Sequence, residues 1–253
     1  MKAIIIAAGL GSRLASLTED LPKCLIDVGG KRIVDHQLAA FRTNGITDIS
    51  MVRGYKAERI TIPDIQYYFN DNYKVNNILA SLMYAEPAMN DAFIASYSDI
   101  IFEPSVVQKL LTTTADISIV VDTAWQGAYN GRTEHPLIEA EKVIFDEHGN
   151  VREIGKHITL SDAPHGEFIG MLLCTQTGAA IFKKRYHQAK TAHTGKPFVQ
   201  AKTFDKAYLT DFIQYLTHEG IKTHCVPIEG GWCEIDTPQD IQRATTMIGR
   251  SDA

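Results

Sequence analysis

The sequence predicts an α/β protein with a doubly wound, mostly parallel sheet and a small antiparallel insertion. Apolar runs alternate along the chain with segments of helical spacing. The apolar runs are continuous, as expected for strands that are buried on both faces. The alternation is interrupted once, after Asp122, by a stretch typical of a hairpin. In sheets of this kind, ligands bind beyond the carboxyl ends of the strands.

The first half of the chain supplies the parallel strands and their helices. Residues 2–8 form a continuous apolar run that ends in glycine, which predicts a buried strand. Residues 33–45 have helical spacing and a glycine stop. The same alternation predicts strands at 48–55, 65–70, 92–102 and 115–122, and helices at 76–89 and 105–113.

The second half begins with two extended runs in residues 141–158, around His148-Gly149-Asn150, which predict a hairpin. Further elements are a strand at 166–175 leading into a long helix, a helix at 207–220, a strand at 222–236 and a closing helix. Thr237 should cap this last helix and Pro238 should start it. Without linkers or repeats, we expect one domain over 1–253, with a substrate-covering insertion at roughly 123–170.

Composition limits the partners and the location. The chain has 253 residues, of which 45% are hydrophobic and 22% charged, and its formal charge is −5. This charge gives no bulk attraction to nucleic acid or to an anionic membrane, so we expect neither as a partner. No segment approaches the ~18 apolar residues of a membrane span, and we expect a cytoplasmic protein. The four scattered cysteines should be reduced and partly buried.

The strand at 2–8 runs into the glycine-rich turn AAGLGSRL, residues 7–14. Its glycines permit a tight turn whose backbone N–H groups point at anionic oxygens. The turn is not a dinucleotide fingerprint, because Leu14 stands where the third glycine should be, and no G-K-[ST] follows as in a Walker loop. The residues predicted to bind a nucleotide here are Ala7, Ala8, Gly9, Gly11 and Ser12.

Two cations follow this turn. Arg13 offers a planar fork for phosphate, and Lys23 offers a compact point charge. Between them, residues 17–22 form a loop that can fold over a triphosphate. The combination resembles the nucleotidyltransferase superfamily, which includes sugar-nucleotide pyrophosphorylases and phosphocholine cytidylyltransferases. The matching positions are Gly9, Gly11, Arg13, Leu14, Leu17, Thr18, Pro22, Lys23 and Leu25.

The resemblance implies a Rossmann-like, GT-A-like fold and a set of catalytic residues. It implies that the glycine turn and Arg13 hold the triphosphate, and that Lys23 stabilises charge developing at the α-phosphate. The family also needs a metal-binding aspartate after a central strand, and a second acidic residue late in the chain. Asp99 matches the first, and Glu234 and Asp236 match the second. Such carboxylates suit Mg²⁺, the expected cofactor.

Residues 69–82 resemble the phosphocholine cytidylyltransferase branch. Asn77 and Ser81 there could present polar groups to a cytosine edge, although Asn76 and Asn77 also suit a helix N-cap. CTP is the expected nucleotide, with UTP and dTTP left open.

Four later motifs together resemble phosphonate-pathway cytidylyltransferases: YSDIIF (97–102), DISIVVDTAW (116–125), EIGKH (153–157) and GEFIGM (166–171). Lys156 is predicted to meet the acceptor phosphate or phosphonate, with Arg132 as a second candidate that equally suits a solvated loop. The resemblance places five aromatic residues around the acceptor pocket: Trp125, Tyr129, Phe168, Tyr208 and Trp232. With Asp211 or Glu167 nearby, such a wall would suit choline or a protonated amine, although these aromatics equally suit the core. We expect the nearby histidines on the surface or in loops: His135, His148, His157 and His165.

The expected activity is transfer of CMP from CTP to a small acceptor, with release of pyrophosphate. The acceptor candidates are phosphocholine, 2-aminoethylphosphonate, hydroxyalkylphosphonates and phosphorylated amino-acid amides. Three alternatives remain open: a sugar-1-phosphate nucleotidyltransferase that uses UTP or dTTP, a non-catalytic nucleotide-binding domain, and a nucleotide-sugar glycosyltransferase. Whether the chain forms a homodimer is also left open.

Overall fold

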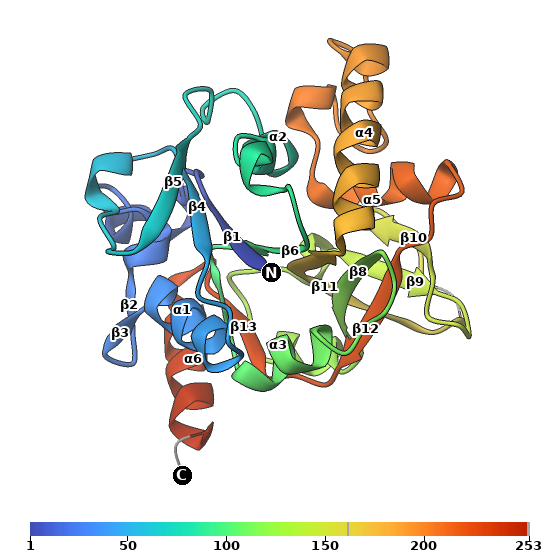
Figure 1. Ribbon diagram of the computed structural model, residues 1–253. Helices are drawn as coiled ribbons and strands as arrows, with labels where there is room; N and C mark the ends of the chain where they lie inside the picture. Colours follow the sequence, from blue (N-terminus) through green and yellow to red (C-terminus); the bar gives the residue numbers. More distant parts are fainter. Residues whose placement is uncertain (161, 252–253) are drawn as a thin grey trace.

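The computed structural model describes residues 1–160 and 162–251, with a nine-stranded mixed sheet at the centre (Figure 1). Its parallel part has the order β6-β1-β4-β5, and β11 pairs antiparallel with β6. From β11 the sheet continues to β9 and β10 on one branch and to β8 and β12 on the other. The strands are β1 Lys2–Ala7, β4 Ile49–Arg53, β5 Ile65–Phe69, β6 Phe93–Tyr97, β8 Ile117–Asp122, β9 Lys142–Phe145, β10 Val151–Gly155, β11 His165–Cys174 and β12 His224–Ile228.

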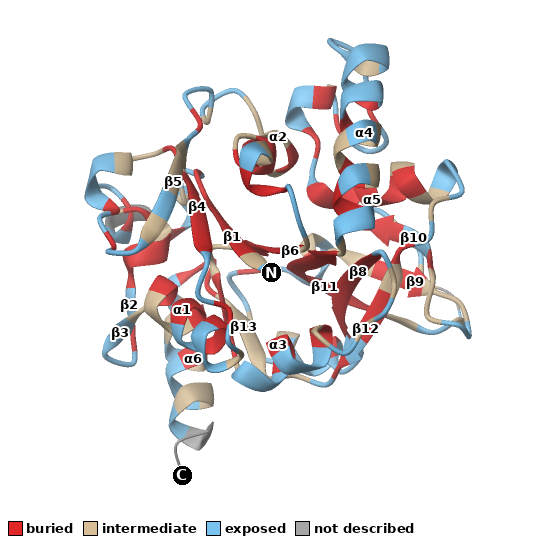
Figure 2. Cartoon of the chain, in the orientation of Figure 1, coloured by how far each residue is buried: buried red, intermediate tan, exposed pale blue. Residues whose placement is uncertain are grey.

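Helices cover both faces of the sheet, as the alternate residues of β1 show. Ile4 and Ile6 pack with α2 (Ile78–Met83), α4 (Gln176–His193) and α5 (Leu209–His218). Ala3, Ile5 and Ala7 pack with α1 (Ile33–Thr43) and α3 (Pro104–Leu110). Figure 2 shows the strands between these helices as mostly buried. The predicted doubly wound α/β class is therefore confirmed.

Two segments that were each predicted as one strand are each split into two strands. The second halves of both segments pair with each other beside the site. The strand predicted at 92–102 splits, because the chain turns at Ser98 and Asp99 and leaves the large sheet as β7 (Ile100–Phe102). The strand predicted at 222–236 also splits, and its second part, β13 (Trp232–Glu234), pairs antiparallel with β7. Next to this pair, the Ile235 N–H donates to the Asp99 carbonyl at 2.8 Å. Two acidic segments far apart in sequence are thereby held together.

The remaining elements mostly follow the prediction. The hairpin at 141–158 is present as β9 and β10, which pair antiparallel. The closing helix α6 (Pro238–Ser251) starts at the expected proline, but the cap is reversed: Thr237 donates its N–H and hydroxyl to Asp240. A two-stranded ribbon, β2 (Asp27–Val28) and β3 (Lys31–Arg32), was not predicted. The short 3₁₀ helices span Ser12–Leu17, Lys23–Leu25, Ala57–Arg59, Glu86–Ala88, Trp125–Tyr129, Leu137–Glu139 and Phe204–Lys206.

The cysteines and the helices bear on two further expectations. All four thiols are free, and those of Cys24, Cys174 and Cys225 are buried. None of the described helices combines the length and the apolarity that crossing a bilayer requires. The division of the chain into one domain with an insertion at 123–170 stays a prediction.

The start of α4 provides a test of how closely the helix packs on the sheet. A Cβ atom on Gly178 would lie 1.8 Å from the Asp116 carbonyl oxygen. We expect Gly178→Ala to lower the free energy of unfolding by about 3 kcal/mol, because backbone must move to admit the methyl group. Urea unfolding measures this. Gly249→Ala in α6 is the control: no atom lies within 4 Å of its Cβ position, and it should change stability by less than about 1 kcal/mol. Equal effects of the two changes would contradict the packing.

Candidate active site

A cavity of about 400 Å³ opens at the carboxyl ends of β1 and β6. The glycine turn, the β6–β7 turn and β13 contribute to its lining, as do residues beside β9, β10 and β11. The cavity therefore lies where the sheet topology predicts a ligand. Thirteen predicted site residues line it: Ala7, Gly9, Gly11, Ser12, Arg13, Lys23, Asn77, Asp99, Lys156, Glu167, Tyr208, Glu234 and Asp236.

The glycine turn is shaped to face an anion. Gly11 has a φ of 64°, and a Cβ there would lie 3.2 Å from side-chain atoms of Lys23 and Thr18, so glycine is required. A Cβ on Gly9 would meet no atom within 4 Å, although Gly9 lines the cavity. Among the described residues, no protein acceptor is bonded to the N–H groups of Gly9 and Gly11. The turn thus has backbone donors to offer a ligand.

Lys23 lies between two carboxylates, immediately after Pro22. Its ammonium is 2.9 Å from Asp99 Oδ2 and also donates to Asp236 Oδ1. Burial disfavours the charged ammonium, but Asp99 and Asp236 outweigh burial and raise the pKa of Lys23. The lysine is therefore a fixed positive charge in the cavity.

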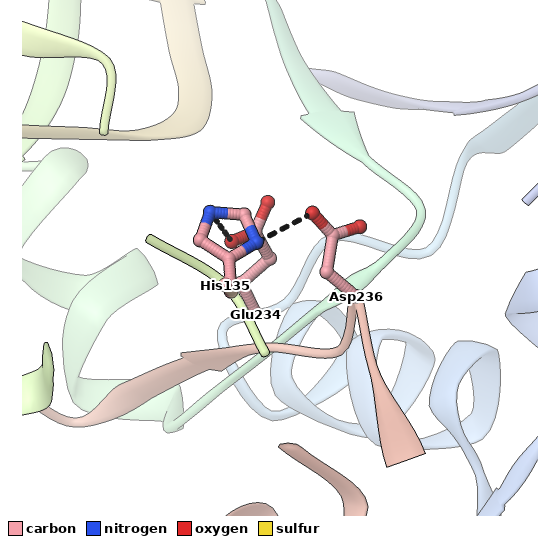
Figure 3. A group of neighbouring side chains, drawn as sticks. All are labelled: His135, Glu234 and Asp236. Atoms are coloured by element: carbon pink, nitrogen blue, oxygen red, sulfur yellow. Dashed lines mark ion pairs between the residues drawn. The ribbon is translucent and has the colours of Figure 1, made fainter. Parts of the chain in front are cut away.

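Asp236 collects two further partners beside Lys23. Its Oδ2 lies 2.7 Å from Arg13 Nη1 and 3.1 Å from His135 Nδ1. Burial opposes ionisation, yet the contact with His135 and the charge of Lys23 hold the pKa of Asp236 well below its usual range. Figure 3 shows the ion pairs that join the His135 ring to Asp236 and to Glu234. The ligand atoms of these three residues lie within 4.8 Å of one another, a spacing that can hold a metal ion.

Glu234 is half-buried beside Arg132. Burial, followed by the charges of Asp236 and Asp99, raises the pKa of Glu234 to about 7. Arg132 was predicted to reach the acceptor, but it does not line the cavity. Its buried guanidinium binds Asp240 at 2.7 and 2.9 Å and Glu234 at 3.2 Å. A buried guanidinium needs carboxylate partners, so Arg132 supports Glu234 rather than facing the cavity.

Four other predicted residues are also absent from the cavity lining. Trp125 is 1% exposed and packs edge-on against Tyr129 in the core. Asp211 caps α5 by accepting from the Tyr208 and Gln200 N–H groups. Ser81 is buried and accepts from the Asn70 amide, whereas Ala8 is buried and its carbonyl accepts from the Tyr55 N–H. Trp125, Asp211 and Ser81 thus direct their side chains to protein atoms, and they and Ala8 lie outside the cavity lining, contrary to the prediction that they bind ligand.

Asn77 lines the cavity and is also the N-cap of α2, the alternative role that the sequence left open. Its side-chain oxygen accepts from the Ile78 N–H at the start of α2, and its amide donates to the Lys206 carbonyl at 3.1 Å. Any role in reading the base must therefore share this side chain with the helix cap.

The sequence missed several cavity residues. His135 lies in a loop, as expected, but it is 3% exposed and stands among the carboxylates of a possible metal site, which the sequence did not predict. His148 and His157 are exposed, as expected, and His165 is half-buried. Tyr97, Glu139 and Glu141 also line the cavity. Their only sequence signal is weak: Tyr97 precedes Asp99 by two residues, and Glu141 directly precedes an apolar strand.

A glycine turn with two cations beside carboxylates supplies the positioning and charge stabilisation that phosphoryl-group transfer requires. The chain is a nucleotidyltransferase. Residues 3–164 match the MobA-like NTP transferase domain, and the chain belongs to this family. Of curated proteins, it is similar to the CTP:phosphoglutamine cytidylyltransferase of Campylobacter jejuni, with 31% identity over 96% of this chain and 98% of that one.

Two other similarities extend the comparison. The UTP–glucose-1-phosphate uridylyltransferase of Haloferax volcanii is 31% identical over 98% of this chain and 96% of its own length. The solved structure of the CTP:phosphocholine cytidylyltransferase from Streptococcus pneumoniae superposes with a TM-score of 0.73 and 21% identity, covering 98% of both chains. The structural match supports the fold alone, whereas the match to the family model shows that the chain is a nucleotidyltransferase.

Proposed function

We propose that this protein is a CTP-dependent cytidylyltransferase, which transfers CMP to a phosphate or phosphonate oxygen of a small acceptor and releases pyrophosphate. The proposal is based on one observation: beside the glycine turn, two cations contact two carboxylates, namely Arg13, Lys23, Asp99 and Asp236. The full-length similarity to a CTP:phosphoglutamine cytidylyltransferase supports cytidylyl transfer to a phosphorylated acceptor.

In the proposed reaction, an acceptor oxygen attacks the α-phosphorus of CTP in line. The bond between that oxygen and phosphorus forms, and the bond from the α-phosphorus to the bridging oxygen of pyrophosphate breaks. Backbone N–H groups of the glycine turn and the fork of Arg13 bind the departing phosphates. The Lys23 ammonium stabilises charge on the α-phosphate oxygens, where it builds during transfer.

The proposal includes Mg²⁺, held by Asp99 and Asp236 with Glu234 nearby. The residues fit this ion because all three offer carboxylate oxygens, which Mg²⁺ prefers. In the part of the chain that the structure describes, the buried Asp99 Oδ1 has no hydrogen-bond partner, so one ligand atom is free. Bound there, the ion would neutralise charge on the triphosphate and orient its phosphates.

We expect CTP to be turned over faster than UTP or dTTP. The sequence of residues 69–82 motivates this preference, and Asn77 and Ile78 from this segment line the cavity. The similarity to a uridylyltransferase supports the competing function, a sugar-1-phosphate uridylyltransferase.

Pyrophosphate release separates the two functions. Each nucleoside triphosphate is incubated with phosphocholine, 2-aminoethylphosphonate and glucose 1-phosphate in turn. The proposal expects release with CTP and with phosphocholine or 2-aminoethylphosphonate as the acceptor. An equal or higher rate with UTP and glucose 1-phosphate would replace it with the sugar-nucleotide function.

A further inference from the structure

Two carboxylates, Glu141 and Glu167, line the side of the cavity away from the glycine turn. Glu167 lies on β11, one strand beyond β6, and Glu141 directly precedes β9, two strands beyond β6. At roughly 5 Å per strand, they lie about 5 and 10 Å across the sheet from the strand that leads to Asp99. A main-chain bond from the Phe168 N–H to the Glu141 carbonyl, 2.8 Å long, holds the two segments together.

Both carboxylates are only partly satisfied by the protein. Glu141 accepts from the Tyr97 and Thr210 hydroxyls, each at 3.3 Å. Glu167 is buried, and its Oε1 accepts from the Tyr129 hydroxyl at 2.5 Å. Since a carboxylate has about four acceptor positions, both retain capacity for further hydrogen bonds. Within residues 1–160 and 162–251, no lysine, arginine or histidine forms an ion pair with either one.

The neighbouring Glu139, in contrast, forms a direct ion pair with a lysine. Lys156 lies 2.9 Å from Glu139 Oε2, and the same ammonium stands 5.0 Å from the centre of the Tyr208 ring. One cation therefore serves Glu139 and covers the Tyr208 face. Lys156 also acts on Glu141 through space, but in the described part of the chain neither Glu141 nor Glu167 has a cation in direct contact.

We propose that Glu141 and Glu167 bind a primary ammonium group at the end of the acceptor remote from its phosphate. The inference rests on the proposed function and names the acceptor class: a small phosphate or phosphonate ester or acid that carries a primary amine. Such an ammonium supplies three N–H donors and a positive charge to two oxygen-rich, unpaired groups.

Burial of these carboxylates supports this class. Burial is the main cause that raises the pKa of Glu141 to about 7 and that of Glu167 to about 8. A raised pKa means that such a buried carboxyl takes up a proton when no cation is bound, whereas a bound cation with hydrogen-bond donors stabilises its charged form.

The geometry also separates a primary amine from a trimethylated one. A trimethylammonium group has no N–H donor and is recognised mainly by aromatic faces. Here the Tyr208 face already meets Lys156, and Tyr97 directs its hydroxyl to Glu141 while its ring packs edge-on against Phe168. The wall therefore offers hydrogen-bond acceptors rather than an aromatic cage.

The test compares phosphoethanolamine with n-propyl phosphate, in which a methyl group replaces the ammonium, and with phosphocholine. With CTP and Mg²⁺, we expect kcat/KM for phosphoethanolamine to exceed that of the other two by at least ~10²-fold, because polar groups left unpaired reject the analogue. Glu141→Gln and Glu167→Gln should each reduce the ratio of phosphoethanolamine to propyl phosphate by ~10-fold or more, and leave the KM for CTP unchanged. A merely structural role would lower both rates together.

The control is Glu147→Gln, an exposed change in the β9–β10 turn, which should alter no ratio. Calorimetric titration with CTP separates the two proposals. Phosphocholine or propyl phosphate turned over as fast as phosphoethanolamine would overturn the inference and leave the cytidylyltransferase standing. CTP binding without turnover of any amine-bearing acceptor would also overturn the inference. Failure to bind CTP or release pyrophosphate with any acceptor would overturn both.

Discussion

Lys23→Ala should lower kcat by about 10² to 10³, a loss of roughly 3–4 kcal/mol of transition-state stabilisation, by analogy with removing one oxyanion-hole donor. The ammonium is fixed between Asp99 and Asp236 and already points into the cavity. Such a charge matters most when the α-phosphate oxygens gain charge, so the rate should fall more than CTP affinity. Steady-state kinetics at saturating CTP measures the two effects separately.

Two further variants sharpen this result. Lys23→Arg should restore little activity, because a planar fork does not replace a compact point charge. Lys109→Ala, an exposed change on α3, should leave kcat unchanged. If Lys23→Ala instead raised the KM for CTP at near-native kcat, Lys23 would be a binding residue only.

Asp99→Asn and Asp236→Asn should each reduce turnover by more than ~10³-fold, since metal-assisted charge stabilisation contributes several kcal/mol. Asp99 is the cleaner position because its side chain is 26% exposed, against 3% for Asp236. Asp236 also contacts Arg13, Lys23 and His135, so its neutralisation leaves the buried Lys23 with one carboxylate partner, Asp99, instead of two. Pyrophosphate release measures the activity of each variant.

The fold of each aspartate variant is checked by circular dichroism and thermal unfolding. In the native protein, EDTA should stop the reaction and added Mg²⁺ should restore it. Undiminished release in both variants, or full activity in EDTA, would refute the metal assignment.

The sequence predicted the part of the cavity around the glycine turn because these residues are contiguous. The turn at 7–14, Arg13 and Lys23 follow one strand, so a short motif contains most of their geometry. Asp99 and Asp236 could be predicted as separate positions from the family resemblance. Their meeting through β7 and β13 could not, because it depends on a pairing between strands more than 100 residues apart.

The remainder of the cavity was less predictable because its residues are scattered along the chain. Arg132 and Trp125 are residue types expected in an acceptor site, yet both interact with other parts of the protein instead. Asp240 binds Arg132, and Tyr129 packs on Trp125. Conversely, His135 and Glu141 look like ordinary polar residues of a loop. Only the fold shows that His135 reaches Asp236 and that Glu141 meets Tyr97 and Thr210.

The central claim is that the chain transfers CMP to a phosphorylated acceptor. Phosphorus NMR of a mixture of enzyme, CTP, Mg²⁺ and phosphoethanolamine tests this most directly, because each product has its own resonance. We predict that CTP is consumed with equal formation of pyrophosphate and a CMP–acceptor diphosphate. Pyrophosphate with free CMP and no adduct, or unchanged CTP across the panel of acceptors, would contradict the claim.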